Sequence, residues 1–315
     1  MNDPKTIQRI SRAKASVDPR LCMVIFVKGP LRNHAERLAS LWKCLLLTSA
    51  GKSLARYRFW NETQWRPLSP PQLAQEFGAA FGFPSDLNVE WGVQISAANA
   101  DGPDSETFID ILDLVPILGN ERLSYIQIRF QENSKASEFA LFANWVVNNF
   151  PVWWGTAGWY FHHSAGQNHT AYKKIAAKSK RHWGIQILDL TALQWEGLRG
   201  LPGVNWLTLI GNDFALERGL DMSTLVEQTT SLASGVFCRT GEFGLVIAAG
   251  SRPLQGDVNT GESISTYSEV ANLLKPLLLA KHAPLSGPFE NADVMNAWLR
   301  RFDNPQAWVE CDISA

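Results

Sequence analysis

Three histidines lie close together in the chain, and histidine is a common ligand of transition metals. His162 and His163 are adjacent, and His169 follows six residues later. Neither the HExxH spacing of zinc peptidases nor two histidines with a nearby carboxylate are present. Because neighbouring strand residues point to opposite faces, His162 and His163 do not share one ion. We therefore expect histidines without a metal, and no cofactor in this chain.

Other short motifs of enzyme sites are incomplete. Residues 49–53 (SAGKS) end like a phosphate-binding loop, but Leu46 stands where that loop needs a glycine. Residues 101–106 (DGPDSE) lack the spacing of a calcium loop. No serine lies in a GxSxG elbow. These patterns predict a protein that is not an enzyme. The alternative is a hydrolase or metal-dependent enzyme with an unrecognised site near His162, His163 and Asp257.

The composition indicates a globular protein without a membrane segment. The chain is 45% hydrophobic and 19% charged, with thirteen tryptophans and a net charge of −1. The four cysteines are far apart and form no CxxC pair, which argues against a structural zinc site. No apolar run reaches 18 residues, and the polar, basic N-terminal segment has no signal-peptide core. We expect a cytoplasmic protein that does not contact the membrane.

The charges are distributed very unevenly. Residues 67–121 contain nine acids and no Lys or Arg, so these 55 residues carry −9 and the other 260 carry +8. Seven acids of this window are predicted to bind a basic partner: Asp86, Glu90, Asp101, Asp104, Glu106, Asp110 and Asp113. The alternative is that the acids are scattered over solvent-facing sites. The basic helix expected at 168–181 lacks interleaved aromatic residues, so we expect no direct binding of nucleic acid.

The elements that must position these residues follow an α+β pattern. Apolar runs and alternation predict strands over 21–29, 88–98, 107–118, 122–130, 153–163, 184–190, 204–211, 235–240 and 244–250. Helical spacing predicts helices over 31–47, 135–149, 168–181 and 221–233. Capping boxes beginning at Ser69, Thr191 and Thr266 predict three further helix starts. The expected fold is α+β, with a mixed, largely antiparallel sheet covered by amphipathic helices.

The domain organisation expected from these elements is simple. Residues 1–20 are expected to be loosely ordered, and residues 21–315 to form one α+β domain. The alternative is two sub-halves divided near 135–150. The aromatic stretch WWGTAGWYFHH at 153–163 is predicted to be a core strand, because small residues alternate with large ones.

Three segments in order resemble a known family. They are VNWLTLIG at 204–211, AAGSRPLQGDVN at 248–259 and STYSEVANLLKPL at 265–277. Together they resemble bacterial type VI secretion immunity proteins, those paired with VRR-Nuc nuclease effectors. The resemblance extends from about residue 21 to 303. It implies a protein that binds and neutralises a cognate DNA nuclease by occluding its DNA-binding or active site. The catalytic metal would belong to the toxin, and the family offers no catalytic residue to carry over.

The shared motif residues have a simpler expected role. Asn205 and Trp206 are predicted to lock a strand end. Four residues are predicted to shape a tight loop: Gly250, Pro253, Gly256 and Asp257. Because each immunity protein must recognise a different toxin, a shared motif is a poor place for cognate specificity. A structural protein of the secretion apparatus is a further alternative.

Overall fold

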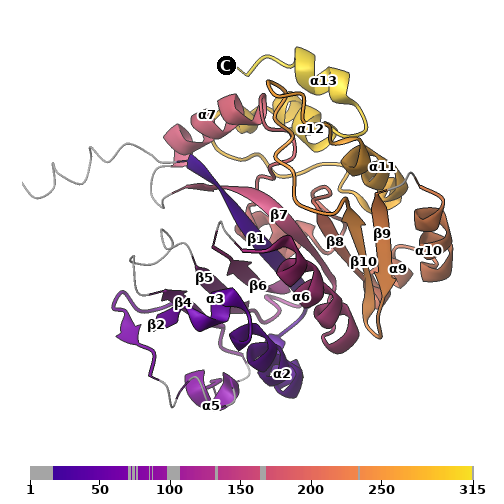
Figure 1. Cartoon of the computed structure of the whole chain (residues 1–315). Coiled ribbons are helices and arrows are strands. Elements are labelled where there is room, and N and C mark those ends of the chain that lie inside the picture. Colours follow the sequence, from indigo (N-terminus) through magenta and orange to yellow (C-terminus); the bar gives the residue numbers. More distant parts are fainter. Residues whose placement is uncertain are drawn as a thin grey trace, which may run out of the picture.

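The chain folds around one ten-stranded sheet with helices on its faces (Figure 1). The computed structural model describes residues 17–69, 72, 75, 77–84, 86, 88–97, 107–131, 134–163, 168–232 and 235–313. The strand order is β3-β2-β4-β5-β6-β1-β7-β8-β10-β9, and every neighbouring pair is antiparallel. This confirms the α+β prediction and the largely antiparallel sheet.

The centre of the sheet is formed by long apolar strands. β1 (Val17–Lys28) lies between β6 (Leu123–Arg129) and β7 (Trp154–His163). Seven consecutive residues of β1 are buried, because both of its faces are covered. The aromatic stretch at 153–163 is therefore a core strand, as its composition predicts. Gly155 lies so close to β1 that an added Cβ would be 2.7 Å from the Val24 carbonyl oxygen.

The two sides of the sheet carry the remaining strands. On one side, β4 (Trp91–Ala97), β5 (Phe108–Asp113) and β6 form an antiparallel meander of three consecutive strands. β2 (Leu54–Phe59) and β3 (Arg66–Pro67) extend it to the edge. On the other side lie β8 (Leu207–Gly211), β10 (Gly244–Ala249) and β9 (Val236–Thr240). The sheet is continuous between the two sides, across the sub-half division considered near 135–150.

Helices from the first half cover the face that Figure 1 shows. They include η1 (Leu31–His34), α2 (Ala35–Leu46), α3 (Ser49–Lys52), α5 (Phe77–Phe81) and α6 (Ala136–Asn149). α2 buries Leu38, Trp42 and Leu45, which recur at helical spacing. The Trp42 ring meets Phe77 and Phe81 edge-on at 5.6 Å. This contact joins α5 to the main core.

The second half adds a separate small core. The helical elements of this half are α7 (Asn168–Ser179), α8 (Leu190–Glu196), α9 (Asn212–Glu217), α10 (Met222–Thr230), α11 (Ser265–Leu273), η3 (Lys275–Leu277), η4 (Gly287–Glu290), α12 (Ala292–Leu299) and α13 (Pro305–Glu310). Most of them pack against the main core, whereas α7, η4, α12 and α13 surround the small one. Phe289, Trp298 and Trp308 form the centre of this core, beside α7. Buried Arg301 lies 3.6 Å from the centre of the Trp298 ring.

Four local predictions differ from the structure. Residues 184–190 are not a strand, because Gln186 alone bridges β7 and its side chain donates to the Val204 carbonyl oxygen. Asp189, rather than Thr191, caps α8. Thr266 lies inside α11, and its hydroxyl donates to the Ala249 carbonyl oxygen. Residues 17–20 belong to β1 rather than to a loose N-terminal segment. The cap of α8 is a local contact of Asp189 with the next residues of the chain, and in the other three cases a tertiary partner overrides the local pattern.

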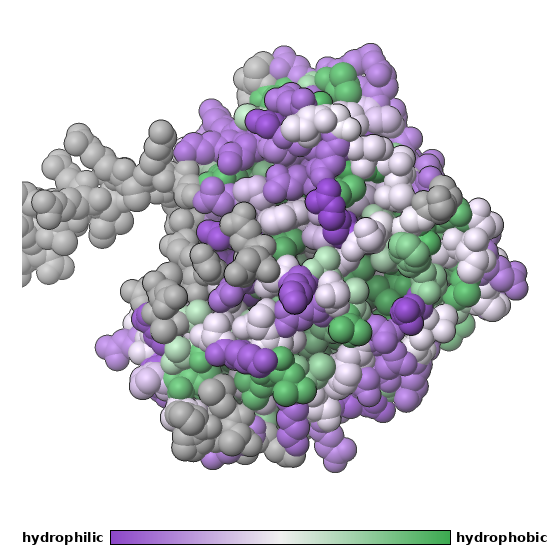
Figure 2. Space-filling view, in the orientation of Figure 1, coloured by the Kyte–Doolittle hydropathy of each residue, from purple (hydrophilic) through white to green (hydrophobic). Residues whose placement is uncertain are grey.

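Two features of the exterior follow from this fold. Within the described residues, none of the helices is both long and apolar enough to cross a bilayer. Figure 2 shows hydrophobic residues in separate patches among hydrophilic ones. Leu47, after α2, and Leu141, on α6, are among the exposed hydrophobic residues.

Candidate protein-binding surface

The seven acids predicted to bind a partner divide into three groups. Asp86 and Glu90 are exposed, directly before β4. Asp110 and Asp113 lie on β5 and are buried. Asp101, Asp104 and Glu106 lie outside the described residues. The predicted contact with a partner needs exposed side chains, and Asp110 and Asp113 do not meet this condition, because every residue of β5 is buried.

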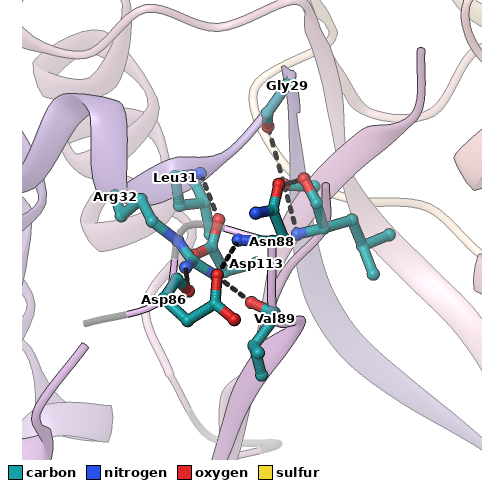
Figure 3. Close-up of polar contacts among 9 residues, drawn as sticks. Gly29, Leu31, Arg32, Asp86, Asn88, Val89 and Asp113 are labelled. Carbon is teal, nitrogen blue, oxygen red and sulfur yellow. Dashed lines mark hydrogen bonds and ion pairs between the residues drawn. The ribbon is translucent and has the colours of Figure 1, made fainter. Parts of the chain in front are cut away.

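Asp113 is an internal anchor (Figure 3). Its carboxylate forms an ion pair with Arg32 and accepts the Leu31 backbone N–H at 2.6 Å. Burial raises the pKa of Asp113, and the hydrogen bond and charge of Arg32 oppose that rise. Both side chains are almost fully buried. Loss of either side chain would therefore leave the other as an unpaired buried charge, which destabilises the fold.

Arg32 connects this buried pair to the surface. Its other guanidinium nitrogens donate to the carbonyl oxygens of Asp86, at 3.1 Å, and Val89, at 2.5 Å (Figure 3). The Asp86 carboxylate accepts the Asn88 backbone N–H at 2.8 Å, which closes a local turn. Arg32 thus holds the chain on both sides of this turn. The exposed acids Asp86 and Glu90 project from a backbone that the core positions.

Asp110 positions an aromatic residue in a similar way. Its carboxylate accepts the indole N–H of Trp60 at 2.8 Å and the hydroxyl of Tyr125 at 3.2 Å. Burial raises the pKa of Asp110, and these hydrogen bonds oppose the rise. The Trp60 ring lies against Gly92, where an added Cβ would be 2.5 Å from Trp60 Cδ1. Trp60 is nevertheless 48% exposed. It is a surface aromatic side chain held in one orientation.

Trp60 borders a cavity of about 560 Å³, which we call the aromatic pocket. Its apolar lining includes Phe59, Trp60, Phe83, Val89, Trp91 and Leu112. Glu62 and Glu90 also line it. A half-exposed tryptophan beside an apolar hollow with acidic neighbours has the composition of a protein-binding surface.

Basic residues from outside the acidic window reduce its charge. Arg122 pairs with Glu90, and Lys28 contacts Glu121 at 3.0 Å. Glu62, which lies outside the window but lines the aromatic pocket, pairs with Arg66. Arg32 pairs with buried Asp113. Several of the nine acids are therefore paired or buried, so the net charge that this window presents at the surface is smaller than −9. Among the described acids of the window, Asp86 is the exposed one that lies outside these pairs.

A second cavity lies beside the histidines of the enzyme alternative. It measures about 540 Å³, and its lining includes Cys22, Tyr160, His162 and His163. Burial raises the pKa of the Cys22 thiol to about 12, so the thiol remains protonated and is a poor nucleophile. Asp257 does not line this cavity. Among the residues that the structure describes, no group of three or more His, Cys, Asp or Glu side chains is arranged to hold a metal.

The strand-end residues of the motif make internal contacts. Asn205 is fully buried, and its side chain donates to the Trp159 carbonyl oxygen at 3.3 Å. The Trp206 indole donates to the Gly250 carbonyl oxygen at 2.8 Å. An added Cβ at Gly158 would lie 2.0 Å from Asn205 Oδ1. Asn205 and Trp206 thus bond β7 and the end of β10 to the start of β8.

The loop residues of the motif also bond within the fold. Gly250 and Gly256 have φ values of +115° and +65°. Pro253 is half-buried between them. The Asp257 carboxylate accepts two hydrogen bonds from Arg181, at 2.8 and 2.7 Å, and one from the Asn259 backbone N–H. These contacts, the Arg181 bonds first, lower the pKa of Asp257 to about 2.

Sequence reasoning did not identify Arg32 or Trp60. Arg32 follows the Gly29-Pro30 break after an apolar strand, and Trp60 follows the last residue of β2. Their importance comes from the buried carboxylates that they contact, Asp113 for Arg32 and Asp110 for Trp60, and these are distant in the sequence. One feature of the sequence indicates such contacts. Residues 67–121 contain no Lys or Arg, so any cationic partner of a buried acid in this window must come from another part of the chain.

Comparison with known proteins identifies a family and a similar solved structure. A family model described as "Type VI immunity for VRR-NUC" (TsiV) matches residues 121–302, which is more than half of the chain. Pseudomonas aeruginosa T6SS protein PA0821 has a similar structure, with a TM-score of 0.70 over 99% of this chain and 95% of that chain. The two are 16% identical, so this likeness shows the fold alone. No curated protein matches the chain.

Proposed function

The chain belongs to the family of type VI immunity proteins for VRR-Nuc effectors, and on that premise we propose how it acts. It binds one cognate VRR-Nuc effector and occludes the effector's DNA-binding or active site. The chain performs no reaction itself, binds no nucleic acid directly, and acts in the cytoplasm, where the effector would otherwise damage DNA. The family match is the observation that carries this proposal.

The aromatic pocket is our proposed contact for the effector. A nuclease must bind the phosphates of DNA, so its binding surface is basic. Asp86 and Glu90 would face such a surface, and Trp60 would supply an aromatic anchor. This surface lies before residue 121, outside the span that the family model matches. That position supports the proposal, because a contact specific to one toxin need not resemble those of other family members.

The rigidity of this surface supports tight binding. Arg32 fixes the backbone of the turn, and Asp110 fixes the ring of Trp60. A surface that is already ordered loses less conformational entropy on binding. The buried carboxylates that sequence reasoning assigned to direct contact therefore have an indirect role in this proposal.

The direct test uses the purified chain and the candidate effector encoded beside its gene. We expect the two proteins to co-purify as a complex with a fixed ratio. DNA cleavage by the effector should stop when the chain is added at that ratio. Co-purification with components of the secretion apparatus, without protection of DNA, would instead favour a structural role. Turnover of a substrate by the chain alone, abolished by His163→Ala, would favour the enzyme alternative.

Charge reversal at Asp86 tests the proposed contact. Asp86→Lys should lower the association rate with the effector roughly 3- to 10-fold at low salt, because electrostatic attraction speeds encounter. The difference should narrow as salt increases. The matched control is Glu227→Lys, which makes the same charge change at an exposed position on α10. Stopped-flow binding at several salt concentrations measures both variants. Equal rates for the two would contradict this location of the contact.

A further inference from the structure

The turn between β5 and β6 contains an unusual residue. The backbone N–H of Asn120 donates to Ile117 O at 2.9 Å, and that of Ile117 donates to Asn120 O at 3.1 Å. Leu118 and Gly119, between them, have φ values of +51° and +78°. This is a type I′ turn, in which Asn, Asp and Gly are the favoured residues. Among the described residues, Leu118 is the one non-glycine residue with positive φ.

The side chain of Leu118 contributes nothing to the core. It is 96% exposed, and the neighbouring Ile117 is also exposed. Leucine therefore has a cost in backbone conformation here that no internal packing offsets. Asparagine would suit the turn better and would remove an apolar side chain from water. Any favourable role of the Leu118 side chain must therefore come from a contact with another molecule.

The base of this hairpin is firmly held. The Leu114 backbone N–H donates to Ser124 Oγ at 2.9 Å, and that hydroxyl donates to the Gly29 carbonyl oxygen at 2.7 Å. Gly29 in turn donates its N–H to the Arg122 carbonyl oxygen at 3.1 Å. Figure 3 shows Gly29 near the Arg32–Asp113 pair that anchors the neighbouring turn. The exposed tip projects from a fixed platform.

The surroundings of the tip define the chemistry of its partner. Lys28 contacts Glu121, in the hairpin, and Glu217, at the end of α9, so these two segments are neighbours. Leu216, beside Glu217, is 75% exposed. Glu121 and Glu217 are partly exposed and share this one lysine, so these three side chains together carry one negative charge in excess beside the apolar side chains. An apolar socket with a cationic rim is the complementary surface.

We propose that Leu118, with Ile117 beside it, inserts into an apolar socket with a cationic rim on the nuclease effector. This inference rests on the proposed function and adds a second contact to the aromatic pocket. The two contacts lie at the same end of the sheet, because Arg122 at the hairpin base pairs with Glu90 at the pocket. A basic nuclease surface meets both contacts with complementary charge.

The test replaces Leu118 with a residue that the turn favours. In Leu118→Asn, thermal unfolding should occur at the same temperature or higher, since asparagine adopts positive φ readily. Affinity for the effector should fall at least about tenfold, mainly through faster dissociation. Leu47→Asn is the matched control, because Leu47 is similarly exposed but follows α2. It should bind as tightly as the wild type.

The outcomes separate this inference from the proposed function. If the wild-type chain does not bind the effector, the proposed function fails and this inference fails with it. If the wild type binds and Leu118→Asn binds equally well, only the inference is overturned. Sedimentation of the chain alone provides a second check. A concentration-dependent dimer that disappears in Leu118→Asn would show that the tip meets a second copy of the chain, and would overturn the assignment to the effector.

Discussion

Replacing Arg32 with methionine should destabilise the protein by about 3–5 kcal/mol, because it leaves the buried Asp113 carboxylate without its cation. Both side chains are almost fully buried, so water cannot replace the lost partner. The change also removes the two donors to the Asp86 and Val89 carbonyl oxygens. Urea denaturation at pH 7 measures the free energy of unfolding. Arg66→Met, which breaks the partly exposed pair with Glu62, should cost only about 0–1 kcal/mol.

Lowering the pH should reduce the defect of Arg32→Met. Burial raises the pKa of Asp113, and in the variant Arg32 no longer opposes that rise. The carboxyl should therefore take up a proton at a higher pH than in the wild type, which removes the unpaired charge. The difference in unfolding free energy should shrink as pH falls. A second variant, Arg32→Met/Asp113→Leu, should recover much of the loss. If Arg32→Met is as stable as Arg66→Met, the buried Arg32–Asp113 pair does not stabilise the fold as proposed.

The sequence predicts the fold well where periodicity and burial agree. β1 and β7 are apolar on both faces because they lie at the centre of the sheet, and α2 and α6 show one buried stripe each. The prediction was wrong at 184–190, where an apolar run has only one bridging residue, Gln186. Local pattern cannot distinguish a paired strand from an apolar segment that packs without a partner strand.

The site is less predictable, because its chemistry depends on pairing across the chain. Asp110 and Asp113 are carboxylates, which are usually exposed, yet all six residues of β5 are buried. Their partners, Trp60 and Arg32, are 50 and 81 residues away in the sequence. Counting charges along the sequence does not distinguish buried acids from exposed ones among the nine acids of the window. Only the tertiary structure separates the two buried acids from those that can meet a partner.

This separation changes where binding energy is expected to come from. Exposed carboxylates at a rim mainly affect the rate of association, whereas a buried aromatic anchor affects affinity. The acidic excess beside the aromatic pocket is modest, since Arg122 and Arg66 pair with its two glutamates. Most of the affinity at this contact should therefore come from Trp60 and the apolar lining, with charge guiding the approach.

Trp60→Ala should accordingly weaken binding to the effector by about 2–4 kcal/mol, or roughly 30- to 1,000-fold. The half-exposed ring would become fully buried in the complex, and its fixed orientation keeps the entropic cost of binding low. Titration calorimetry with the purified effector measures the loss. Phe237→Ala removes a similarly exposed aromatic residue from β9, at the opposite edge of the sheet. It should leave affinity unchanged.

Two variants of Asp110 test whether affinity depends on the fixed orientation of the Trp60 ring or only on the presence of that ring. Asp110→Asn keeps an oxygen that can accept the indole N–H, so its affinity should stay near that of the wild type. Asp110→Leu removes the acceptor and frees the ring, so its affinity should fall between those of the wild type and Trp60→Ala. Circular dichroism would verify that each variant is folded at the temperature of the binding measurement. If Trp60→Ala binds like Phe237→Ala, the effector does not contact the aromatic pocket.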